Sequence, residues 1–314
     1  MRLHRRTFLA AGAAAAWTYA LPRPSGAADL TPFNITITHY PEQDYALPVV
    51  VAQDLGFMKA EGVDVRPIVG SSGGGTTVRN IAQGGLTMAE ASTAAAIKSI
   101  VAGENLKIIA AGVQTPGTIC WVAKRGSPVK AIADLEGKTV GFTQPGSVSE
   151  TLLGMCLRAA GIDPAKVKTR AAGGIGENIT LLISGALDAA FTVDPILTNR
   201  SRDLQLIFFA RHYVPRYEQT VWMVDAKDVR NPKYAGFLRA RAKGLDVVQK
   251  EPAKAIEIWA RVTQTDPREE RFTLKNEGAD YFSGGTIDPK GFALVLEGMR
   301  AAKQLPNDKI AIDK

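Results

Sequence analysis

The sequence contains little cysteine and little histidine, and this argues against several kinds of site. Its 314 residues include 2 cysteines and 3 histidines. Cys120, Cys156, His39 and His212 show no metal-ligand spacing such as Cys-x-x-Cys, so we expect no metal site and no cofactor. We interpret the two cysteines as buried free thiols, and whether they pair with each other stays open.

Long apolar runs are absent after the first residues. Beyond residue 27, no run reaches the roughly 18 apolar residues that a membrane-spanning helix needs. At the start, Arg5-Arg6 and Phe8-Leu9 precede an uncharged segment, and residues 25–27 are typical of a cleavage site. We interpret residues 1–27 as a removed export signal, which predicts a periplasmic protein. The paired arginines resemble a twin-arginine signal, and the general secretory route stays open as the alternative.

A large excess of basic charge is missing from the mature chain. Removing residues 1–27 takes away four of the 38 basic residues, so the formal net charge falls from +7 to +3. No run of lysine and arginine remains, and no basic stripe with interleaved aromatic residues. We therefore expect no nucleic-acid partner.

What the sequence does contain is a repeated order of strand, polar loop and helix. Patterns typical of strands occur at 33–38, 63–69, 86–91 and 106–113, and helical patterns follow the first three of them. The same plan continues with expected strands at 121–124, 139–143, 167–172, 188–193 and 204–210. This repetition predicts an α/β fold with mostly parallel sheets.

The chain after the strand expected at 219–224 is helical. Pro232, Pro252, Pro267 and Pro289 stand where the first turn of a helix tolerates proline, and apolar residues at helical spacing follow each of them. Four helices without strands cannot form a separate α/β domain. We expect all four to pack on the first lobe of the protein.

The predicted architecture is two doubly wound α/β lobes joined by two crossover segments. Residues 30–117 and 218–314 form the first predicted lobe, and residues 118–217 form the second. The crossings lie near Gly117 and Pro215. Lobes linked in this way can rotate as rigid bodies and close on a ligand that touches both. This clamshell is expected to be a monomer.

Two of the strand-loop-helix units lie between Ile132 and Pro195, and their loops are rich in glycine and hydroxyl residues. In the first unit, Ser147 and Glu150 form the pattern of a capping box before an apolar helical segment. In the second unit, residues 173–176 precede a helix expected at 178–184. In open α/β sheets, loops at the ends of strands line the ligand crevice.

The glycine-rich segment 70–75 has three competing motif interpretations. No Gly-Lys-Ser/Thr ends it, which excludes a phosphate P-loop, and no Gly-x-Gly-x-x-Gly occurs at an expected strand end. It does match Gly-x-Ser-x-Gly with Ser72 at the centre, the pattern of a hydrolase nucleophile. A hydrolase needs a histidine that follows the serine, and only His212 does so. We therefore expect a binding protein and not an enzyme, with an exported serine hydrolase as the weaker alternative.

Several phrases resemble the periplasmic solute-binding proteins of the nitrate, sulfonate and taurine class, an NMT1-like group. They are residues 51–57, 61–65, 134–141 and 185–191, followed by Asp194-Pro195. The resemblance implies the type II periplasmic binding protein clamshell. It also implies capture of a small solute and its delivery to the membrane permease of an ABC transporter.

We expect the ligand to be a small organic anion, such as a sulfonate or a carboxylate. Helix starts with unpaired amides face the predicted cleft, and such ends favour negative charge. A pyrimidine-type thiamine precursor is the alternative ligand, and aromatic residues would stack on it. The residues expected to bind the ligand are Tyr40, Tyr45, Ser71, Ser72, Ser92, Thr93, Gln114, Gly146, Ser147, Gly174, Asp194 and Trp222.

Overall fold

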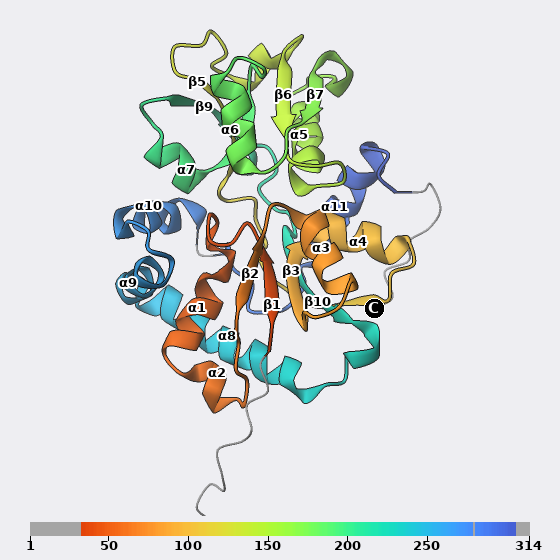
Figure 1. The fold of residues 1–314 in the computed structure, drawn as a ribbon. Coiled ribbons are helices and arrows are strands. Elements are labelled where there is room, and N and C mark those ends of the chain that lie inside the picture. Colours follow the sequence, from red (N-terminus) through yellow and green to blue (C-terminus); the bar gives the residue numbers. More distant parts are fainter. Residues whose placement is uncertain (1–32, 279, 306–314) are drawn as a thin grey trace, which may run out of the picture.

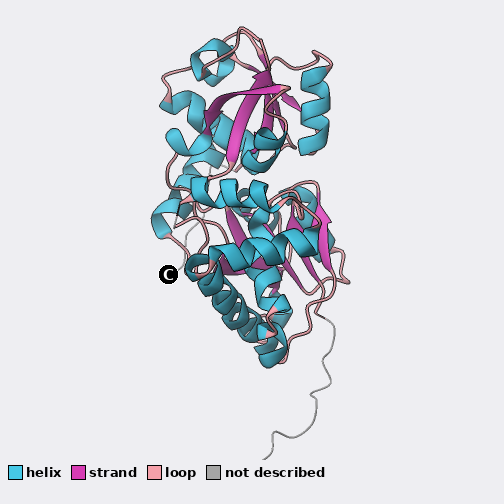
Figure 2. Ribbon diagram, turned by 90° about the vertical axis from the view of Figure 1, so that its left-hand side faces the viewer, coloured by secondary structure: helices cyan, strands magenta, loops and turns pink. Residues whose placement is uncertain are grey.

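The computed structural model describes residues 33–278 and 280–305, and the expected export signal at 1–27 lies outside them. The described chain forms two lobes, one above the other in Figure 1, each with its own strands. Figure 2 shows the strands of each lobe between helices. The two α/β lobes expected from the sequence are therefore present.

The first lobe is built on a five-stranded sheet of order β2-β1-β3-β10-β4. Its strands are β1 (Ile35–Thr38), β2 (Ile68–Ser71), β3 (Met88–Ser92), β4 (Leu106–Ala111) and β10 (Thr220–Asp225). β1 pairs in parallel with both β2 and β3, as predicted. The returning strand β10 is antiparallel to both of its neighbours, β3 and β4.

The second lobe contains a three-stranded sheet of order β8-β5-β9 and a parallel pair, β6-β7. An isolated parallel bridge between Val140 and Ala189 joins the two parts. The strands are β5 (Ile119–Lys124), β6 (Thr139–Phe142), β7 (Lys168–Ala171), β8 (Ala190–Val193) and β9 (Leu204–Phe209). β5 is antiparallel to β8 and β9, so this lobe is less parallel than the repeated pattern predicts.

Helices follow most strands, and local sequence explains where they begin. In the first lobe, helices follow β1, β2 and β3: α1 (Leu47–Asp54), α2 (Phe57–Ala60), α3 (Gly74–Ala82) and α4 (Thr93–Val101). The second lobe has α5 (Val148–Ala159), α6 (Ile175–Ile183) and α7 (Asp194–Asn199). The last four helices each begin on their predicted proline: α8 (Pro232–Lys250), α9 (Pro252–Thr263), α10 (Pro267–Glu277) and α11 (Pro289–Ala301).

Several expected element boundaries differ from the structure by a few residues, and two of them lie at the site. The strand expected at 63–69 is Ile68–Ser71, because Pro67 lacks an N–H for the strand ladder and the pairing begins after it. Gly70 and Ser71 therefore belong to a strand, although we expect a loop there from the sequence. The helix expected at 178–184 begins earlier, at Ile175, directly after the glycine pair 173–174.

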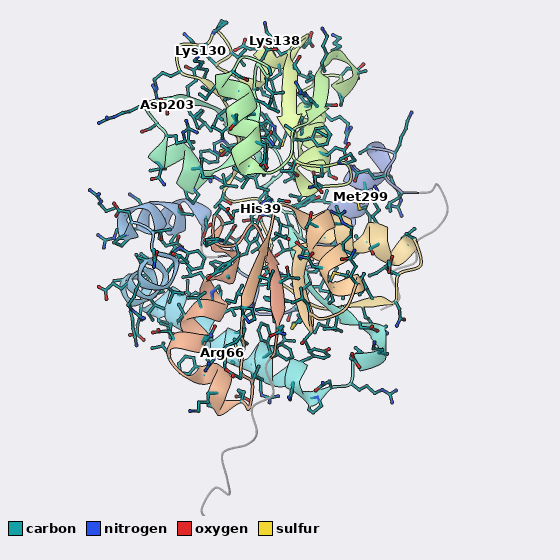
Figure 3. All side chains as sticks on the ribbon, in the orientation of Figure 1. His39, Arg66, Lys130, Lys138, Asp203 and Met299 are labelled. Carbon is teal, nitrogen blue, oxygen red and sulfur yellow. The ribbon has the colours of Figure 1, made fainter. Side chains whose placement is uncertain are left out.

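The last helices do not all pack on the first lobe alone, and this expectation was wrong for α10 and α11. α8 and α9 pack against α1 as expected. α10 packs against α7 of the second lobe as well as α9, and α11 packs against α5 of the second lobe as well as α4 of the first. Val295, Leu296 and Met299 of α11 share a hydrophobic cluster with Leu152 of α5. A glycine at 298 allows this approach. Figure 3 labels Met299 at the level where the lobes meet.

The two crossover segments lie side by side and are hydrogen-bonded to each other. The first joins β4 to β5 and the second joins β9 to β10. The backbone N–H of Gln219 donates to the carbonyl of Val113 at 2.8 Å, and that of Tyr217 donates to Gln114 at 3.2 Å. The side chain of Arg211 also donates to the carbonyl of Gly117. The crossings therefore act as one connection between the lobes.

Candidate functional site

A small cavity lies between the lobes and is lined by residues from both; we call it the inner cavity. Thr38, His39, Gln43, Tyr45, Gly74, Ser92, Gln219 and Thr220 line it from the first lobe, and Thr143, Ser147, Val148 and Phe191 from the second. Its volume is ≈ 10 Å³. This is about the room of one water molecule, so the lobes are closed over it.

A larger hollow opens outward beside the inner cavity, and we call it the outer cleft. It has a volume of ≈ 530 Å³ and is lined by His39, Tyr40, Glu42, Gly70, Ser71, Ser72, Gly174, Ile175, Gly176, Glu177 and Ile196. His39 lines both spaces. Figure 3 labels His39 near the centre of the molecule, where the two lobes meet.

The parallel strands of the first lobe bring its polar residues to the site. Thr38, Ser71 and Ser92 are the last residues of β1, β2 and β3. Because the carboxyl ends of parallel strands meet at one edge of a sheet, their hydroxyls come together under the second lobe. α3 and α4 begin at this same edge, as the sequence predicts for a ligand crevice.

The hydroxyl groups of the first lobe are bonded to one another. Thr77 Oγ1 lies 2.6 Å from Thr38 Oγ1 and 2.5 Å from Ser71 Oγ. Ser92 is the N-cap of α4, and its Oγ accepts a hydrogen bond from the N–H of Ala95 at 3.2 Å. The network fixes these side chains before any ligand binds.

The second lobe contributes the start of α5, where the expected N-cap is present. Ser147 Oγ accepts from the N–H of Glu150 at 3.3 Å, and lies 2.9 Å from Ser149 Oγ. In a capping box the carboxylate of Glu150 would accept from the N–H of Ser147. Here it accepts instead from the N–H of the preceding residue, Gly146, at 2.6 Å. A negative charge therefore already lies beside the positive end of α5.

Two buried glutamines and a tyrosine form the polar floor of the inner cavity. Gln219 Nε2 donates to the hydroxyl of Tyr45, and Gln43 Nε2 donates to Thr118 Oγ1 at 3.2 Å. All three residues are at most 2% exposed. The Oε1 atoms of both glutamines are buried and have no hydrogen-bond partner in the described chain.

Burial changes the protonation of groups in and near the site. It lowers the pKa of His39 to about 4, so the imidazole is neutral at pH 7. It raises the pKa of Asp44, next to Tyr45, to about 6, and it raises that of Glu277 well above its usual range. Because His39 is neutral and the other eleven lining residues carry no charge at pH 7, the lining of the inner cavity is uncharged.

The structure brings seven of the twelve predicted site residues to these two spaces. Tyr45, Ser92 and Ser147 line the inner cavity, and Tyr40, Ser71, Ser72 and Gly174 line the outer cleft. The other five are Thr93, Gln114, Gly146, Asp194 and Trp222, and the described linings of the two spaces do not include them.

Trp222 is a correction, because its ring lies in the core of the first lobe. It is fully buried, and its ring centroid lies 4.9 Å from that of Phe237. The inner cavity lies at the end of β10 marked by Thr220, whereas Trp222 is two residues further into the strand and packs against α8. It therefore cannot stack on a ligand between the lobes.

The remaining four residues serve the structure around the site. Gln114 donates to the carbonyl of Thr286 at 2.8 Å and lines a separate hollow behind the crossings. Asp194 begins α7 and is 1% exposed, and Thr93 is fully buried beside Ser92. Gly146 has a φ of 80° and lies against Lys98 of the other lobe.

Sequence reasoning missed several residues that line the inner cavity. They are Thr38, His39, Gln43, Gly74, Thr143, Val148, Phe191, Gln219 and Thr220. Thr38 and Thr143 stand at the ends of strands that the sequence predicts, so their position could have identified them. Gln43 and Gln219 carry no such signal, because a glutamine near the start of an element is usually exposed.

The described chain contains little that would support other chemistry. No hydrogen bond in the described part joins Ser72 to His39 or His212. Among the same residues, no three histidine, cysteine, aspartate or glutamate side chains gather as a metal site would require. No helix between residues 33 and 305, where described, has the length and apolar character to cross a bilayer.

Comparison with protein families and curated sequences gives two matches. The model of the family described as NMT1/THI5 like matches residues 43–255. A putative thiamine biosynthesis protein of Haemophilus influenzae is 23% identical over 246 residues, covering 75% of this chain and 74% of that protein.

Solved structures share the fold at low sequence identity. The periplasmic aliphatic sulphonate binding protein SsuA of Escherichia coli has a TM-score of 0.70 and 16% identity, covering 88% of this chain and 89% of that one. The alkanesulfonate-binding protein SsuA of Xanthomonas axonopodis pv. citri, bound to MOPS, has a TM-score of 0.73 and 15% identity, covering 88% and 94%. The nitrate-binding protein NrtA of Synechocystis PCC 6803 has a TM-score of 0.69 and 16% identity, covering 90% and 84%. The expected periplasmic binding protein fold is confirmed.

Proposed function

The chain belongs to the NMT1/THI5-like family, and from this premise we propose that it is an extracytoplasmic solute receptor. It captures a small organic solute between its two lobes and delivers it to the permease of an ABC transporter. The observation that carries the proposal is the inner cavity, which hydrogen-bonding side chains from both lobes enclose.

Capture works through the closure of the lobes. In this proposal most of residues 33–117 and 218–305 form one lobe and residues 118–217 form the other, while α10 and α11 also contact the second lobe. The paired crossings are the hinge. Since the inner cavity has room for about one water molecule, a ligand reaches it only when the lobes separate. A ligand that then contacts both lobes stabilises the closed form by those contacts.

A small organic anion is the first candidate ligand, and helix starts support it. α3, α4 and α5 begin at residues that line the inner cavity, and α6 begins at the outer cleft. Against an anion, α5 holds the carboxylate of Glu150, and the carboxylate of Glu177 folds over Gly174 at the start of α6. No lysine or arginine belongs to the described lining of either space.

A pyrimidine-type thiamine precursor is the second candidate, and a different observation favours it. Tyr45 and Phe191 contribute aromatic surface to the inner cavity, and neutral His39 and two glutamine amides contribute hydrogen-bonding groups. A flat heterocycle uses both kinds of contact. The curated relative carries thiamine biosynthesis in its name, and this supports testing such ligands.

We further propose that the protein is periplasmic, acts as a monomer and performs no catalysis. The export signal that the sequence predicts at residues 1–27 supports the location. The lack of a bond from Ser72 to a histidine in the described chain speaks against the hydrolase, because a serine nucleophile needs a base in contact with it.

The receptor proposal is tested by a ligand screen on the mature protein. Thermal shift against sulfonates, carboxylates, nitrate and pyrimidines should identify a stabilising compound, since a ligand at 100 times its Kd stabilises by about 2.7 kcal/mol. Small-angle scattering should then show an ensemble that becomes more compact when that compound is added. A stabilising compound that leaves the scattering profile of an open apo protein unchanged would contradict capture by closure.

A further inference from the structure

The inner cavity has no charged group with which to neutralise an ion. Its twelve lining residues include no lysine, arginine, aspartate or glutamate, and burial keeps its histidine neutral. Glu90 is not part of the lining, and the Oγ1 of Thr220, which is, donates to it at 2.7 Å. An ion enclosed here would lose its hydration without gaining a counter-charge, which is costly inside a protein.

Most hydroxyl groups around the inner cavity already have partners. Thr38 bonds Thr77, Ser92 and Ser147 cap their helices, and Thr220 accepts from the N–H of Val113 while it donates to Glu90. Thr143 Oγ1 lies 3.0 Å from Ser149 Oγ. These groups position the lobes and helices, so they add little selectivity among ligands.

The two glutamine amides differ from the hydroxyls, because only one end of each is bonded. Tyr45 holds the Nε2 of Gln219, and Thr118 holds the Nε2 of Gln43. The two Oε1 atoms are buried acceptors, and neither has a hydrogen-bond partner within the described chain. Both glutamines line the inner cavity. A buried acceptor without a donor costs about 1–3 kcal/mol, so a ligand that supplies N–H groups recovers this energy.

We propose that Gln43 and Gln219 are the specificity-determining residues of this site, and that they select an uncharged ligand that presents N–H groups, such as an amide, urea or lactam. A carboxylate or sulfonate offers only acceptors, which these carbonyl oxygens repel. The inference rests on the proposed function, since it assigns the ligand class of the same cleft.

Matched pairs of small compounds test this class directly. Acetamide and acetate, nicotinamide and nicotinate, and methanesulfonamide and methanesulfonate differ mainly in whether they present N–H groups or a negative charge. Calorimetric titration of the mature protein should give a Kd at least about tenfold lower for the neutral member of a pair that binds, which corresponds to about 1.4 kcal/mol. An acid that binds as tightly as its amide overturns the inference.

Variants at the glutamines separate a specificity role from a structural one. Gln219→Met and Gln43→Met keep the size of the side chain and should each weaken amide binding at least about tenfold, with the folded state verified by circular dichroism. Gln219→Glu should instead gain affinity for acetamidinium, which pairs N–H groups with a carboxylate. Gln83→Met changes an exposed glutamine at the end of α3 and is the matched control.

The outcomes also distinguish this inference from the receptor proposal. Unchanged amide affinity in the glutamine variants, or failure of every amide to bind, rejects the inference. In either case, another solute that stabilises and compacts the protein leaves the receptor proposal standing. If no solute in the wider screen does so, the receptor proposal itself fails.

Discussion

The carboxyl groups of Asp44 and Glu277 are both buried, and each acts electrostatically on the other in the interior of the protein. Asp44 begins the short 3-10 helix before α1, and Glu277 ends α10. The hydroxyl of Tyr281 also donates to Asp44, at 3.3 Å. Burial and the repulsion between two like charges raise the pKa of both carboxyl groups, so the protonated form of each is favoured.

This pair should make stability fall as the pH rises. Burial raises the pKa of Asp44 from 3.8 to about 6, so its protonated form stabilises the fold fully below about pH 4 and this contribution is lost as the pH rises through about 6. In Asp44→Asn, the decrease in the free energy of unfolding between low and high pH should be smaller by roughly 2–3 kcal/mol. Denaturant unfolding from pH 4 to pH 8 measures it. Asp203→Asn, at an exposed carboxylate paired with Arg200, should keep the wild-type profile.

His39 should make the stability of the fold decrease as the pH falls. Its pKa is lowered from 6.5 to about 4, so the neutral ring stabilises the fold above about pH 6.5 and this contribution is lost as the pH falls through about 4. His39→Asn suits the φ of 56° at this position. It should reduce the loss of stability between pH 6.5 and pH 4 by up to roughly 3 kcal/mol. His212→Asn changes an exposed histidine and should leave this loss of stability unchanged. If the two variants had the same dependence of stability on pH, the burial of His39 would not be its cause.

Gly298 should be necessary for the packing of α11 on α5. A Cβ at this position would lie 2.4 Å from Met155 Sδ and 2.8 Å from Thr151 Cγ2. Gly298→Val should push the helices apart and lower the free energy of unfolding by roughly 1–3 kcal/mol, as measured by urea titration.

The matched control for Gly298 is Gly154→Ala in α5. Its Cβ would make only ordinary contact, at 3.5 Å from Arg158. The change should leave stability equal or raise it by up to about 1 kcal/mol, because alanine favours helix. If Gly298→Val were as stable as the wild type, α11 would not pack as described.

Tyr45→Phe should destabilise the protein without ligand. The change removes the hydroxyl that accepts from Gln219 Nε2 and leaves a buried amide unpaired. A loss of roughly 1–2 kcal/mol is expected, read from the midpoint of thermal or denaturant unfolding. Tyr40→Phe is the control, since Tyr40 lies in the outer cleft and is partly exposed. Similar losses in both variants would argue against a special role for the Tyr45 hydroxyl.

Export should depend on the paired arginines near the start of the chain. Replacing Arg5 and Arg6 by lysine should leave precursor in the cytoplasm, because the twin-arginine route reads these two residues. Cell fractionation measures the precursor and mature forms. Normal export of the double variant would indicate the general secretory route.

Features that depend on neighbouring residues could be predicted from the sequence. Pro232 starts a helix because its missing N–H has no partner in a first turn anyway, and Ser147 caps α5 through a bond to a residue three positions later. Ser71 and Ser92 reach the cleft because they end strands whose carboxyl ends share an edge. In each case the decisive contact is local or follows from sheet topology.

Features that depend on contacts distant in sequence could not be predicted. The face of β10 on which Trp222 lies is decided by its packing against Phe237 of α8. The placement of α11 depends on contacts with Met155 and Thr151, which lie in the second lobe and more than 100 residues earlier in the sequence. Likewise, the hydrogen bond that orients the amide of Gln219 is made with Tyr45, which is distant in sequence.

The position of β10 between β3 and β4 constrains the order in which the chain can fold. In the described sheet, β4 has β10 as its only partner, and every strand of the second lobe precedes β10 in sequence. A chain still on the ribosome therefore completes the sheet of the second lobe first and leaves β3 and β4 with unpaired edges until Asp225 has been made. Such edges are templates for aggregation. A fragment that ends before Thr220 would thus be an aggregation-prone chain and not half of a receptor.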